Sequence, residues 1–339
     1  MRNRQIVFTK VNTAELLKAE YKAPGAWDVV VETAFSTVSC GTEKANIMGN
    51  PNVNGGGQAS VVFPRRVGYS SAGTVIAVGS NVEHVKIGDR VVVYWGTHSK
   101  YNTVPEKHVV KIQNDTVSFQ EAALSFIAAF PLAAIRKTHL EIGESAIVMG
   151  LGLLGQLAVR LLRAAGAVPV IGVDFVESRR SEAIRGGADY VFSPDEENFA
   201  FLVKEKTGGG ANVSIEVTGA GSGLDGVLDC MARFGRVALL GCTRNKDFTI
   251  DYYRKVHFPG ITLVGAHTMA RPEYESYPGN FTHDDDIKSV LRLCESHRID
   301  LADMIKETHA PQDCQEVYTR LVHDKDFPVV VQFDWSACN

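Results

Sequence analysis

Short apolar runs separated by glycines dominate the first third of the chain. The runs at 28–33, 73–78, 90–94 and 109–112 are rich in β-branched residues. Such side chains favour strands because they pack well on a pleated surface. The pattern therefore predicts a compact β-rich domain in this part of the chain.

Apolar strands alternate with helical stretches between about residues 131 and 270. This alternation is typical of βαβ units, which build a parallel sheet. We therefore predict a doubly wound, Rossmann-type domain over 131–270. Its strand-like runs lie at 145–149, 168–173, 190–192, 213–217, 237–240 and 261–264.

The last part of the chain carries two helical stretches, 285–297 and 310–323, and a final apolar run at 329–333. That run could return to the β-rich region and complete its sheet. The predicted first domain is therefore discontinuous and comprises residues 1–130 and 271–339.

A glycine-rich turn follows the first strand of the alternating region. Gly150, Gly152 and Gly155 sit where that strand turns into a helical segment at 153–165. Gly150 permits the tight turn, Gly152 leaves room for a pyrophosphate, and Gly155 lets helix and strand pack closely. The free N–H groups at the helix start add an anion site. The spacing predicts a dinucleotide-binding turn.

Asp174 closes the next apolar run, about 20 residues past the glycines, where this fingerprint expects an acid. A carboxylate there accepts hydrogen bonds from ribose hydroxyls and repels a 2′-phosphate. No basic residue stands at 175–178, although Arg179 and Arg180 follow. The sequence therefore favours NAD over NADP as the cofactor.

Composition narrows the class of protein. A chain of 339 residues is too long for one ordinary core, which agrees with two domains. With a net charge of -4, the chain shows no polybasic signature, so we expect no nucleic-acid or membrane partner. We expect no membrane-spanning segment and no signal peptide, because the apolar stretches look too short for either. The six scattered cysteines lack a CxxC pair, so we expect reduced thiols and a cytoplasmic location.

Several motifs together carry a family resemblance. They are Ser39-Cys-Gly-Thr-Glu, Val67-Gly-Tyr-Ser-Ser-Ala-Gly-Thr-Val, Ile87-Gly-Asp-Arg-Val, the glycine turn, Glu216-Val-Thr-Gly-Ala, Gly235-Arg-Val-Ala-Leu-Leu-Gly and Ile261-Thr-Leu-Val-Gly. Over essentially its full length the chain resembles the medium-chain dehydrogenases, whose zinc-dependent members include alcohol and polyol dehydrogenases. The resemblance implies an α/β protein with a GroES-like β-rich catalytic domain, a Rossmann domain and a cleft between them. It also implies a homodimer or homotetramer, with 261–264 at a sheet edge.

The chain departs from the zinc-dependent members at the metal site that the resemblance implies. Those members carry a histidine and a glutamate where Tyr69 and Ser70 stand, and a glutamate or cysteine where Phe126 stands. Of the ligand set only Cys40 remains, whereas a catalytic zinc ion needs three protein ligands. We therefore expect a zinc-free protein with no metal site.

The pairing of Gly-Thr-Glu with Gly-Tyr-x-Ser-x-Gly resembles a zinc-ligand-depleted subgroup that includes bacteriochlorophyllide dehydrogenase-like proteins. In that subgroup the position of Cys40 often holds another residue, which favours a buried structural thiol here. The alternative is a displaced metal site that joins Cys40 to His98, Glu106 or His108. These residues lack a recognisable ligand spacing.

Without zinc, hydroxyl donors and a general acid must take the charge that develops on the substrate oxygen. Tyr69 is the leading candidate because it stands at the position of the metal-binding histidine; the alternative is a packed aromatic. Thr42 resembles the proton-relay hydroxyl of the family. His98 is a further candidate acid, because histidine as a residue type suits proton transfer, although an exposed loop histidine is the commoner case. Glu43 and Lys44 are expected to pair with each other or to face solvent.

The remaining site residues are implied by the resemblance. The substrate pocket would include Cys40, Trp95 and Phe126. The cofactor contacts would be Gly150, Gly152, Leu153, Leu154 and Gly155 at the phosphates, Asp174 and Arg179 at the adenosine ribose, and Thr218, Gly241 and Cys242 along the nicotinamide.

Three functions stay open. The first is an NAD-linked oxidoreductase that transfers a hydride between nicotinamide and a secondary alcohol or ketone, such as a polyol or sugar derivative, without zinc. The second is a zinc-free enone or quinone reductase, although such relatives usually use NADPH. The third is a non-catalytic NAD-binding regulator, since fold alone does not secure function. The substrate depends on loops such as 49–60, which we predict as a surface loop rather than a lid.

Overall fold

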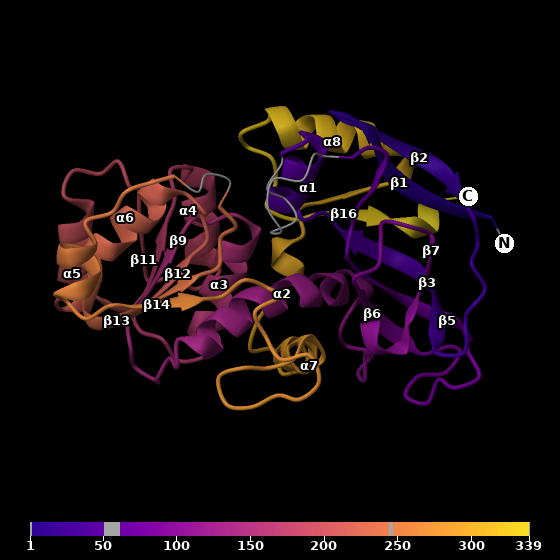
Figure 1. The fold of residues 1–339 in the computed structure, drawn as a ribbon, viewed down its shortest axis with the longest axis horizontal. Coiled ribbons are helices and arrows are strands. Elements are labelled where there is room, and N and C mark those ends of the chain that lie inside the picture. Colours follow the sequence, from indigo (N-terminus) through magenta and orange to yellow (C-terminus); the bar gives the residue numbers. More distant parts are fainter. Residues whose placement is uncertain (1, 51–61, 244–246, 339) are drawn as a thin grey trace. The chain divides into compact units, whose positions relative to one another are not determined.

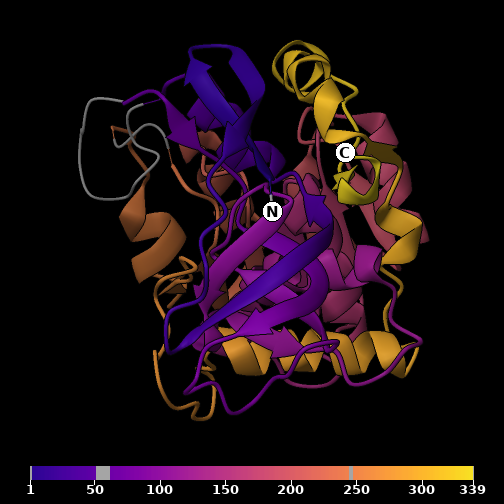
Figure 2. The same cartoon turned by 90° about the vertical axis from the view of Figure 1, so that its right-hand side faces the viewer.

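The computed structural model describes residues 2–50, 62–243 and 247–338, and the chain divides into two compact units (Figures 1 and 2). The first unit comprises Met1–Ile127 and Ile287–Asn339, and the second comprises Ala128–Asp286. Most of the predicted surface loop, residues 51–60, lies outside the described residues.

Two sheets form the framework of the first unit. The larger follows the order β15-β16-β3-β5-β6-β8, with β7 also paired to β3, and the smaller follows β2-β1-β4. The last strand pairs antiparallel with β3, so the end of the chain returns to this unit as predicted. The strands are β1 (Asn3–Lys10), β2 (Thr13–Ala19), β3 (Asp28–Thr37), β4 (Arg65–Arg66), β5 (Ser70–Val78), β6 (Arg90–Tyr94), β7 (Tyr101–Pro105), β8 (Val109–Lys111), β15 (Glu307–His309) and β16 (Val331–Asp334).

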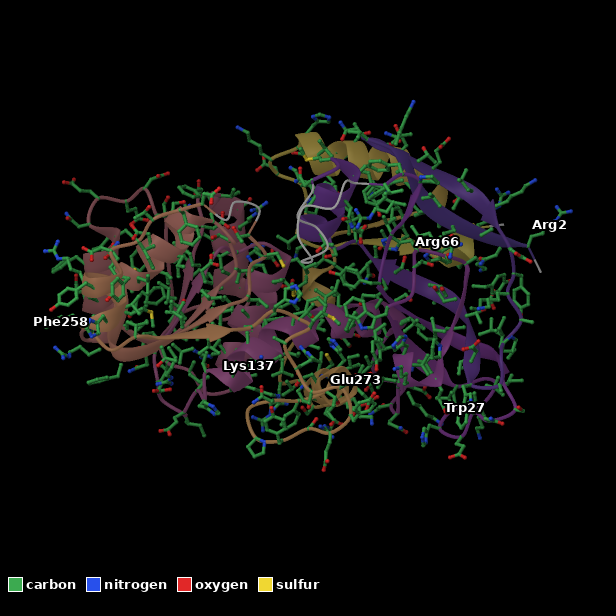
Figure 3. The ribbon with its side chains drawn as sticks, in the orientation of Figure 1. Arg2, Trp27, Arg66, Lys137, Phe258 and Glu273 are labelled. Carbon is green, nitrogen blue, oxygen red and sulfur yellow. The ribbon has the colours of Figure 1, made fainter. Side chains whose placement is uncertain are left out.

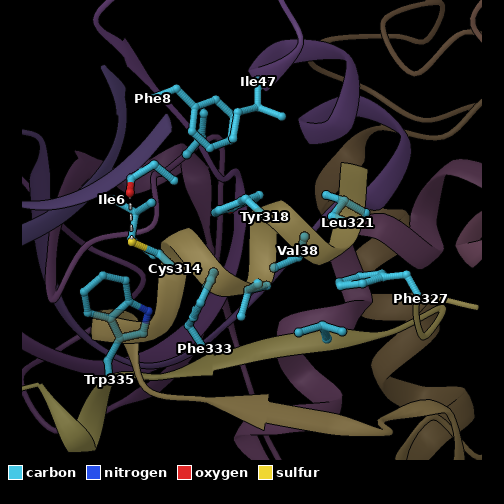
Figure 4. Close-up of a cluster of buried hydrophobic side chains, with 14 of the residues drawn as sticks. Ile6, Phe8, Val38, Ile47, Cys314, Tyr318, Leu321, Phe327, Phe333 and Trp335 are labelled. Atoms are coloured by element: carbon cyan, nitrogen blue, oxygen red, sulfur yellow. Dashed lines mark hydrogen bonds between the residues drawn. The ribbon is translucent and has the colours of Figure 1, made fainter. Parts of the chain in front are cut away.

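Helices α1 (Cys40–Ile47) and α8 (Cys314–His323) contribute to one apolar core of the first unit. In that core Phe8 packs edge-on against Tyr318, and Phe333 and Trp335 are fully buried (Figure 4). Side chains from both ends of the chain therefore meet in one cluster, which fixes α1 against the C-terminal segment. The short helices are η2 (Glu106–His108), η4 (Ala302–Met304), η5 (Pro311–Asp313) and η6 (Trp335–Ala337).

The second unit is built on a six-stranded sheet in the order β11-β10-β9-β12-β13-β14, and every neighbouring pair is parallel. This order confirms the predicted Rossmann sheet. Phe258 projects from this unit (Figure 3). The elements are β9 (Ala146–Met149), α3 (Leu153–Ala164), β10 (Val170–Val173), α4 (Glu177–Arg185), β11 (Tyr190–Phe192), α5 (Phe199–Thr207), β12 (Ala211–Glu216), α6 (Gly221–Asp229), β13 (Met231–Leu239), η3 (Tyr253–His257) and β14 (Thr262–Gly265).

Helix α2 (Phe119–Lys137) corrects one expectation about apolar length. By length and composition alone it could cross a membrane, although the sequence analysis recognised no such stretch. However, 72% of its apolar window is buried inside the protein. Residues 122–124 and 126–129, for example, have no exposed surface. Such burial is what a core helix shows.

The second boundary between the units lies later in the chain than the predicted one, because residues 271–286 group with the second unit. Asp286, near the start of α7 (His283–Glu295), has no exposed surface and pairs with Arg136 at 2.8 Å and with Arg271 at 3.0 Å. These buried ion pairs tie the segment to α2 within the second unit. Sequence periodicity gives no sign of such pairs.

Candidate functional site

The turn between β9 and α3 has the geometry that its three glycines predict. Gly150 adopts φ +96°, which side chains rarely tolerate. A Cβ on Gly155 would overlap the carbonyl oxygen of Gly150, so helix and turn are in close contact. A Cβ on Gly152 would meet nothing within 4 Å. The open surface at Gly152 is where a phosphate could approach the backbone.

Helix α3 begins at this turn without a side-chain cap and without an acidic residue in its first turn. Its first N–H groups therefore keep their capacity to bind an anion, and no carboxylate in that turn repels one. Leu153 is buried beneath the turn, and Leu154 and Gly152 are half-buried. The backbone rather than the leucine side chains is thus the part suited to a phosphate.

Asp174 is joined to the glycine turn by its carboxylate. It lies directly after β10, is 9% exposed, and accepts hydrogen bonds from the N–H groups of Leu151 and Val176, both at 2.8 Å. Each carboxylate oxygen has a further lone pair. Asp174 therefore orders the turn and can still accept a bond from a hydroxyl group.

Two arginines follow Asp174 and differ in what they bind. Arg180 donates to the carbonyl oxygens of Asp174 and Phe175, at 2.7 and 2.9 Å. Arg179 forms a longer ion pair with the Asp174 carboxylate, 3.8 Å between the closest atoms. The Asp174 carboxylate thus has a cation on one side.

A second turn lies beside the glycine turn. A Cβ on Gly150 would come within 3.0 Å of the Thr218 methyl group, and Gly219 and Gly241 approach each other too closely for side chains. The exposed Cys242 follows Gly241. The structure thus brings together the predicted Thr218, Gly241 and Cys242 at the carboxyl ends of β12 and β13.

Glu216 stabilises this second turn by hydrogen bonds to its carboxylate. It is 3% exposed, and its carboxylate accepts bonds from the Thr218 N–H at 2.7 Å, the Thr218 hydroxyl and the Gly219 N–H at 3.3 Å. Burial raises the pKa of Glu216, and these hydrogen bonds offset the rise only in part. Glu216 stands in one of the motifs of the family resemblance, but the sequence pattern gives no sign of this role for its side chain.

In the first unit, His98 and Glu43 are buried and hydrogen-bonded to each other, so the expected exposed histidine was wrong, and so was the expectation that Glu43 pairs with Lys44 or faces solvent. His98 has no exposed surface and Glu43 is 1% exposed. His98 Nε2 donates to the Glu43 carboxylate at 3.1 Å, and its Nδ1 lies 2.7 Å from the Ser36 hydroxyl. Ser36 also accepts a bond from the indole N–H of Trp335. Both ring nitrogens of His98 are therefore engaged inside the protein.

Glu43 accepts two further hydrogen bonds, one from a residue far away in sequence and one from a near neighbour. The Tyr318 hydroxyl donates to it at 2.6 Å, and the Ser39 backbone N–H donates at 3.0 Å. Burial raises the pKa of Glu43, but the charge and hydrogen bond of His98, with the bonds from Tyr318 and Ser39, outweigh it and hold that pKa below 4.5. We name these side chains, Ser36, Glu43, His98, Tyr318 and Trp335, the buried polar network.

Tyr69 lies just before β5 and donates a hydrogen bond to the Ser39 hydroxyl. Its ring packs edge-on against Phe126, 5.8 Å between centroids, and lies 5.9 Å from the ring of Trp95. Trp95 in turn lies 4.9 Å from Phe126. The structure therefore brings the predicted Tyr69, Trp95 and Phe126 into one aromatic cluster beside a serine hydroxyl.

Trp95 carries backbone strain at this cluster. Its φ is +58°, a value rare for a bulky residue. Its N–H donates to the carbonyl oxygen of Tyr69 at 2.9 Å, which fixes the two residues side by side. Strain of this kind persists only where the surroundings enforce it, and it gathers at functional sites.

The donors around α1 do not fit a catalytic zinc ion. The Cys40 thiol points toward the carbonyl oxygens of Val38, Pro328 and Val329, 3.7 to 3.9 Å away. Ser70, at the family's glutamate position, donates to the carbonyl oxygen of Ala123 at 2.7 Å. Within residues 2–50, 62–243 and 247–338, no group of three or more His, Cys, Asp or Glu residues is placed to hold a metal. The other positions contain none of these residue types.

Thr42 lies in the first turn of α1, half-buried, and nothing in the described part of the chain hydrogen-bonds its hydroxyl. In the first unit, the sequence did not indicate Ser39 and Tyr318 as site residues. The capping-box pattern does not single out Ser39, because that pattern places the acid three residues after the serine and Glu43 lies four residues after it. Tyr318 also had no local signal, because it lies 275 residues from Glu43 in sequence.

Comparisons with known proteins agree with this architecture. The family model described as alcohol dehydrogenase GroES-like domain matches residues 25–114, and the one described as zinc-binding dehydrogenase matches residues 154–280. The L-threonine 3-dehydrogenase of Pyrococcus horikoshii is 28% identical and aligns over 89% of this chain and 90% of its own. The D-guloside 3-dehydrogenase of Escherichia coli is 27% identical over 81% and 83%.

A solved structure shows the same fold. The alcohol dehydrogenase zinc-binding domain protein of Burkholderia ambifaria superposes with a TM-score of 0.84 at 18% identity, covering 98% of this chain and 99% of its own. The two family models together match more than half of the 339 residues.

Proposed function

From the premise that the chain belongs to the medium-chain, zinc-type alcohol dehydrogenase-like superfamily and is an oxidoreductase of that kind, we propose the following reaction. The protein transfers a hydride between NAD(H) and a secondary alcohol or its ketone, without a catalytic zinc ion. One observation carries the proposal: the open glycine turn of the second unit is joined to the Asp174 carboxylate.

The residues of the second unit fit a dinucleotide. The backbone at Gly152 and the uncapped start of α3 suit the pyrophosphate, and the remaining lone pairs of Asp174 suit the ribose hydroxyls. A 2′-phosphate would stand next to the Asp174 charge, which supports NAD over NADP. Arg179 partly offsets that charge.

The names of the relatives support a secondary alcohol as substrate. They are L-threonine 3-dehydrogenase and D-guloside 3-dehydrogenase. The aromatic cluster of Tyr69, Trp95 and Phe126 would supply apolar walls to a pocket in the first unit.

A proton must move together with the hydride. When bound, nicotinamide supplies or accepts the hydride at the substrate carbon. The oxygen on that carbon then gains or loses a proton, and a positioned side chain accelerates this step. We assign the step to the Tyr69 phenol, because the donors around α1 do not fit a metal that could polarise the oxygen.

The cofactor part is tested by titrating the protein with NADH and NADPH and following nicotinamide fluorescence. NADH is expected to bind at least about tenfold more tightly, which corresponds to about 1.4 kcal/mol. Asp174→Asn should reduce the ratio of NADH to NADPH affinity. Asp189→Asn is the control: it changes another carboxylate that accepts a backbone N–H at the same sheet, and it should leave this ratio unchanged. Equal binding, or tighter binding of NADPH, would remove the proposed cofactor and favour the enone or quinone reductase.

The metal-free part is tested by mass spectrometry of protein purified without chelator or histidine tag. Less than about 0.1 zinc per chain is expected, whereas about one per chain would restore zinc chemistry.

Tyr69→Phe should lower turnover on a secondary-alcohol panel by about 100-fold or more. Unchanged turnover in a folded variant would reject Tyr69 as the acid. Binding of NADH by the unaltered protein without any turnover would favour the regulator.

We also propose a homodimer, with a homotetramer as the alternative, formed through the edge of the second unit's sheet. Strand β14 is at that edge, and Thr262 and Leu263 are exposed. Light scattering after gel filtration checks the mass. A monomer at micromolar concentration contradicts this proposal.

A further inference from the structure

Ser39 stands where a helix cap belongs but does not act as one. It precedes α1 as its N-cap residue, and its side chain makes no cap hydrogen bond. A serine at this position normally accepts an N–H of the first turn, which stabilises a helix by about 1 kcal/mol. The Ser39 hydroxyl is instead the acceptor for the Tyr69 phenol. Helix α1 thus lacks this cap bond, and the hydroxyl is placed at the aromatic cluster.

Ser118, before α2, shows what a serine does when capping is its role. Its hydroxyl accepts the Glu121 N–H at 3.2 Å, and the Glu121 carboxylate accepts the Ser118 N–H at 3.0 Å. This reciprocal pair is a complete capping box. At α1 the acid lies four residues after the serine rather than three: Glu43 accepts the Ser39 N–H, while the Ser39 hydroxyl binds the Tyr69 phenol.

The position of Ser39 is fixed by the buried polar network. Its N–H bonds to Glu43, and Glu43 is held by His98 and Tyr318. Ser39 itself is only 7% exposed. The acceptor for the Tyr69 phenol is therefore held in place by groups that do not touch Tyr69.

We propose that Ser39 is a positioning residue for Tyr69. The Ser39 hydroxyl orients the Tyr69 phenol and stabilises the phenolate that remains after proton transfer. The inference rests on the proposed role of Tyr69. In ketone reduction the Tyr69 hydroxyl turns its proton from Ser39 to the substrate oxygen, and the O–H bond of Tyr69 breaks as the substrate O–H bond forms. The Ser39 hydroxyl then rotates and donates to the phenolate, and solvent returns the proton. A hydrogen bond to an ionised oxygen is about twice as strong as a neutral one.

The test needs no substrate. The phenolate absorbance of the whole protein is titrated with base, and the spectrum of Tyr69→Phe is subtracted to isolate Tyr69. Ser39→Thr keeps the hydroxyl. Ser39→Val has the same shape as Ser39→Thr but carries a methyl group in place of the hydroxyl. The Tyr69 titration midpoint is expected to rise by about one pH unit, a tenfold change in acid dissociation, in Ser39→Val but not in Ser39→Thr.

Ser118→Ala is the matched control. It removes a true cap, so the melting temperature should fall while the Tyr69 midpoint stays unchanged. Ser39→Gly is the second variant if Ser39→Val does not fold, because glycine at an N-cap costs only a few tenths of a kcal/mol. Equal midpoints in the unaltered protein and the folded variant without the hydroxyl would overturn the role of Ser39.

The two proposals can fail separately. If Tyr69→Phe keeps full turnover, the acid role of Tyr69 fails whatever the midpoints show. If Tyr69→Phe loses turnover and the midpoint does not respond to Ser39, only the positioning role fails.

Discussion

Two buried carboxylates, one in each unit, are held in opposite ways. Glu43 in the first unit accepts bonds from His98 and Tyr318, which come from distant parts of the sequence. Glu216 in the second unit accepts its bonds from Thr218 and Gly219, its near neighbours in the chain. Burial raises the pKa of both, yet Glu43 ends below the ordinary value and Glu216 above it.

The difference shows what an imidazole partner adds to hydrogen bonds. Both carboxylates accept three or more hydrogen bonds, but only Glu43 is paired with an imidazole. The charged form of Glu43 can therefore join separate segments of the first unit. Glu216 organises a local turn, which needs no long-range partner.

The largest expected effect comes from removing that imidazole. His98→Ala leaves the Glu43 carboxylate buried without its partner, which should cost about 3–5 kcal/mol of unfolding free energy. Urea unfolding measures it. The double variant Glu43→Leu with His98→Leu should cost less than the sum of the two single changes, because no unpaired charge remains. A loss below about 1 kcal/mol in His98→Ala would mean that the pair contributes little.

A smaller effect is expected from removing one hydroxyl donor at each carboxylate. Tyr318→Phe takes a hydrogen bond from an ionised group and should cost about 1.5–3 kcal/mol, whereas Thr218→Val should cost about 1 kcal/mol because Glu216 keeps two N–H donors. Chemical denaturation of both variants gives the comparison. Equal losses would indicate that the two carboxylates are held alike.

The smallest effect is a pair of opposite pH dependences. The folded pKa of Glu43 is lowered, so its stabilisation is complete above 4.5 and is lost as pH falls through the folded value. The folded pKa of Glu216 is raised, so stability falls as pH rises from 4.5 through the folded value. Unfolding free energies are measured from about pH 3 to 7. Glu43→Gln should remove the loss of stability toward acidic pH, and Glu216→Gln should remove the loss of stability as pH rises above 4.5. Slopes of the same sign would contradict the assignment.

The second unit could be predicted well from its sequence, because its signals are local. The glycines and Asp174 lie within 25 residues, and the strand–helix alternation determines the sheet around them. Asp174, which the spacing from the glycine turn predicted, also accepts a hydrogen bond from the Leu151 N–H of that turn. In the first unit, the family resemblance indicated Tyr69 but not its partner.

The buried polar network could not be predicted, because its bonds join residues far apart in sequence. His98 lies 55 residues from Glu43, and Tyr318 lies 275 residues from it. A histidine after a strand resembles an exposed loop residue. In the structure its backbone is instead bonded on both sides, to Ile6 and to Val67, which draws the side chain into the core.

The left-handed backbone conformation of Trp95 lets the stability and the activity of the protein be tested at a single position. A non-glycine residue held there costs of order 1–3 kcal/mol, and glycine would adopt the same conformation without that cost. Trp95→Gly would also remove the ring that faces Tyr69 and Phe126. The strain that glycine relieves is opposed by the packing lost with the ring, so stability alone does not decide which residue is kept. A Trp95→Gly variant that melts no lower than the unaltered protein but loses turnover would show that the aromatic wall is in use.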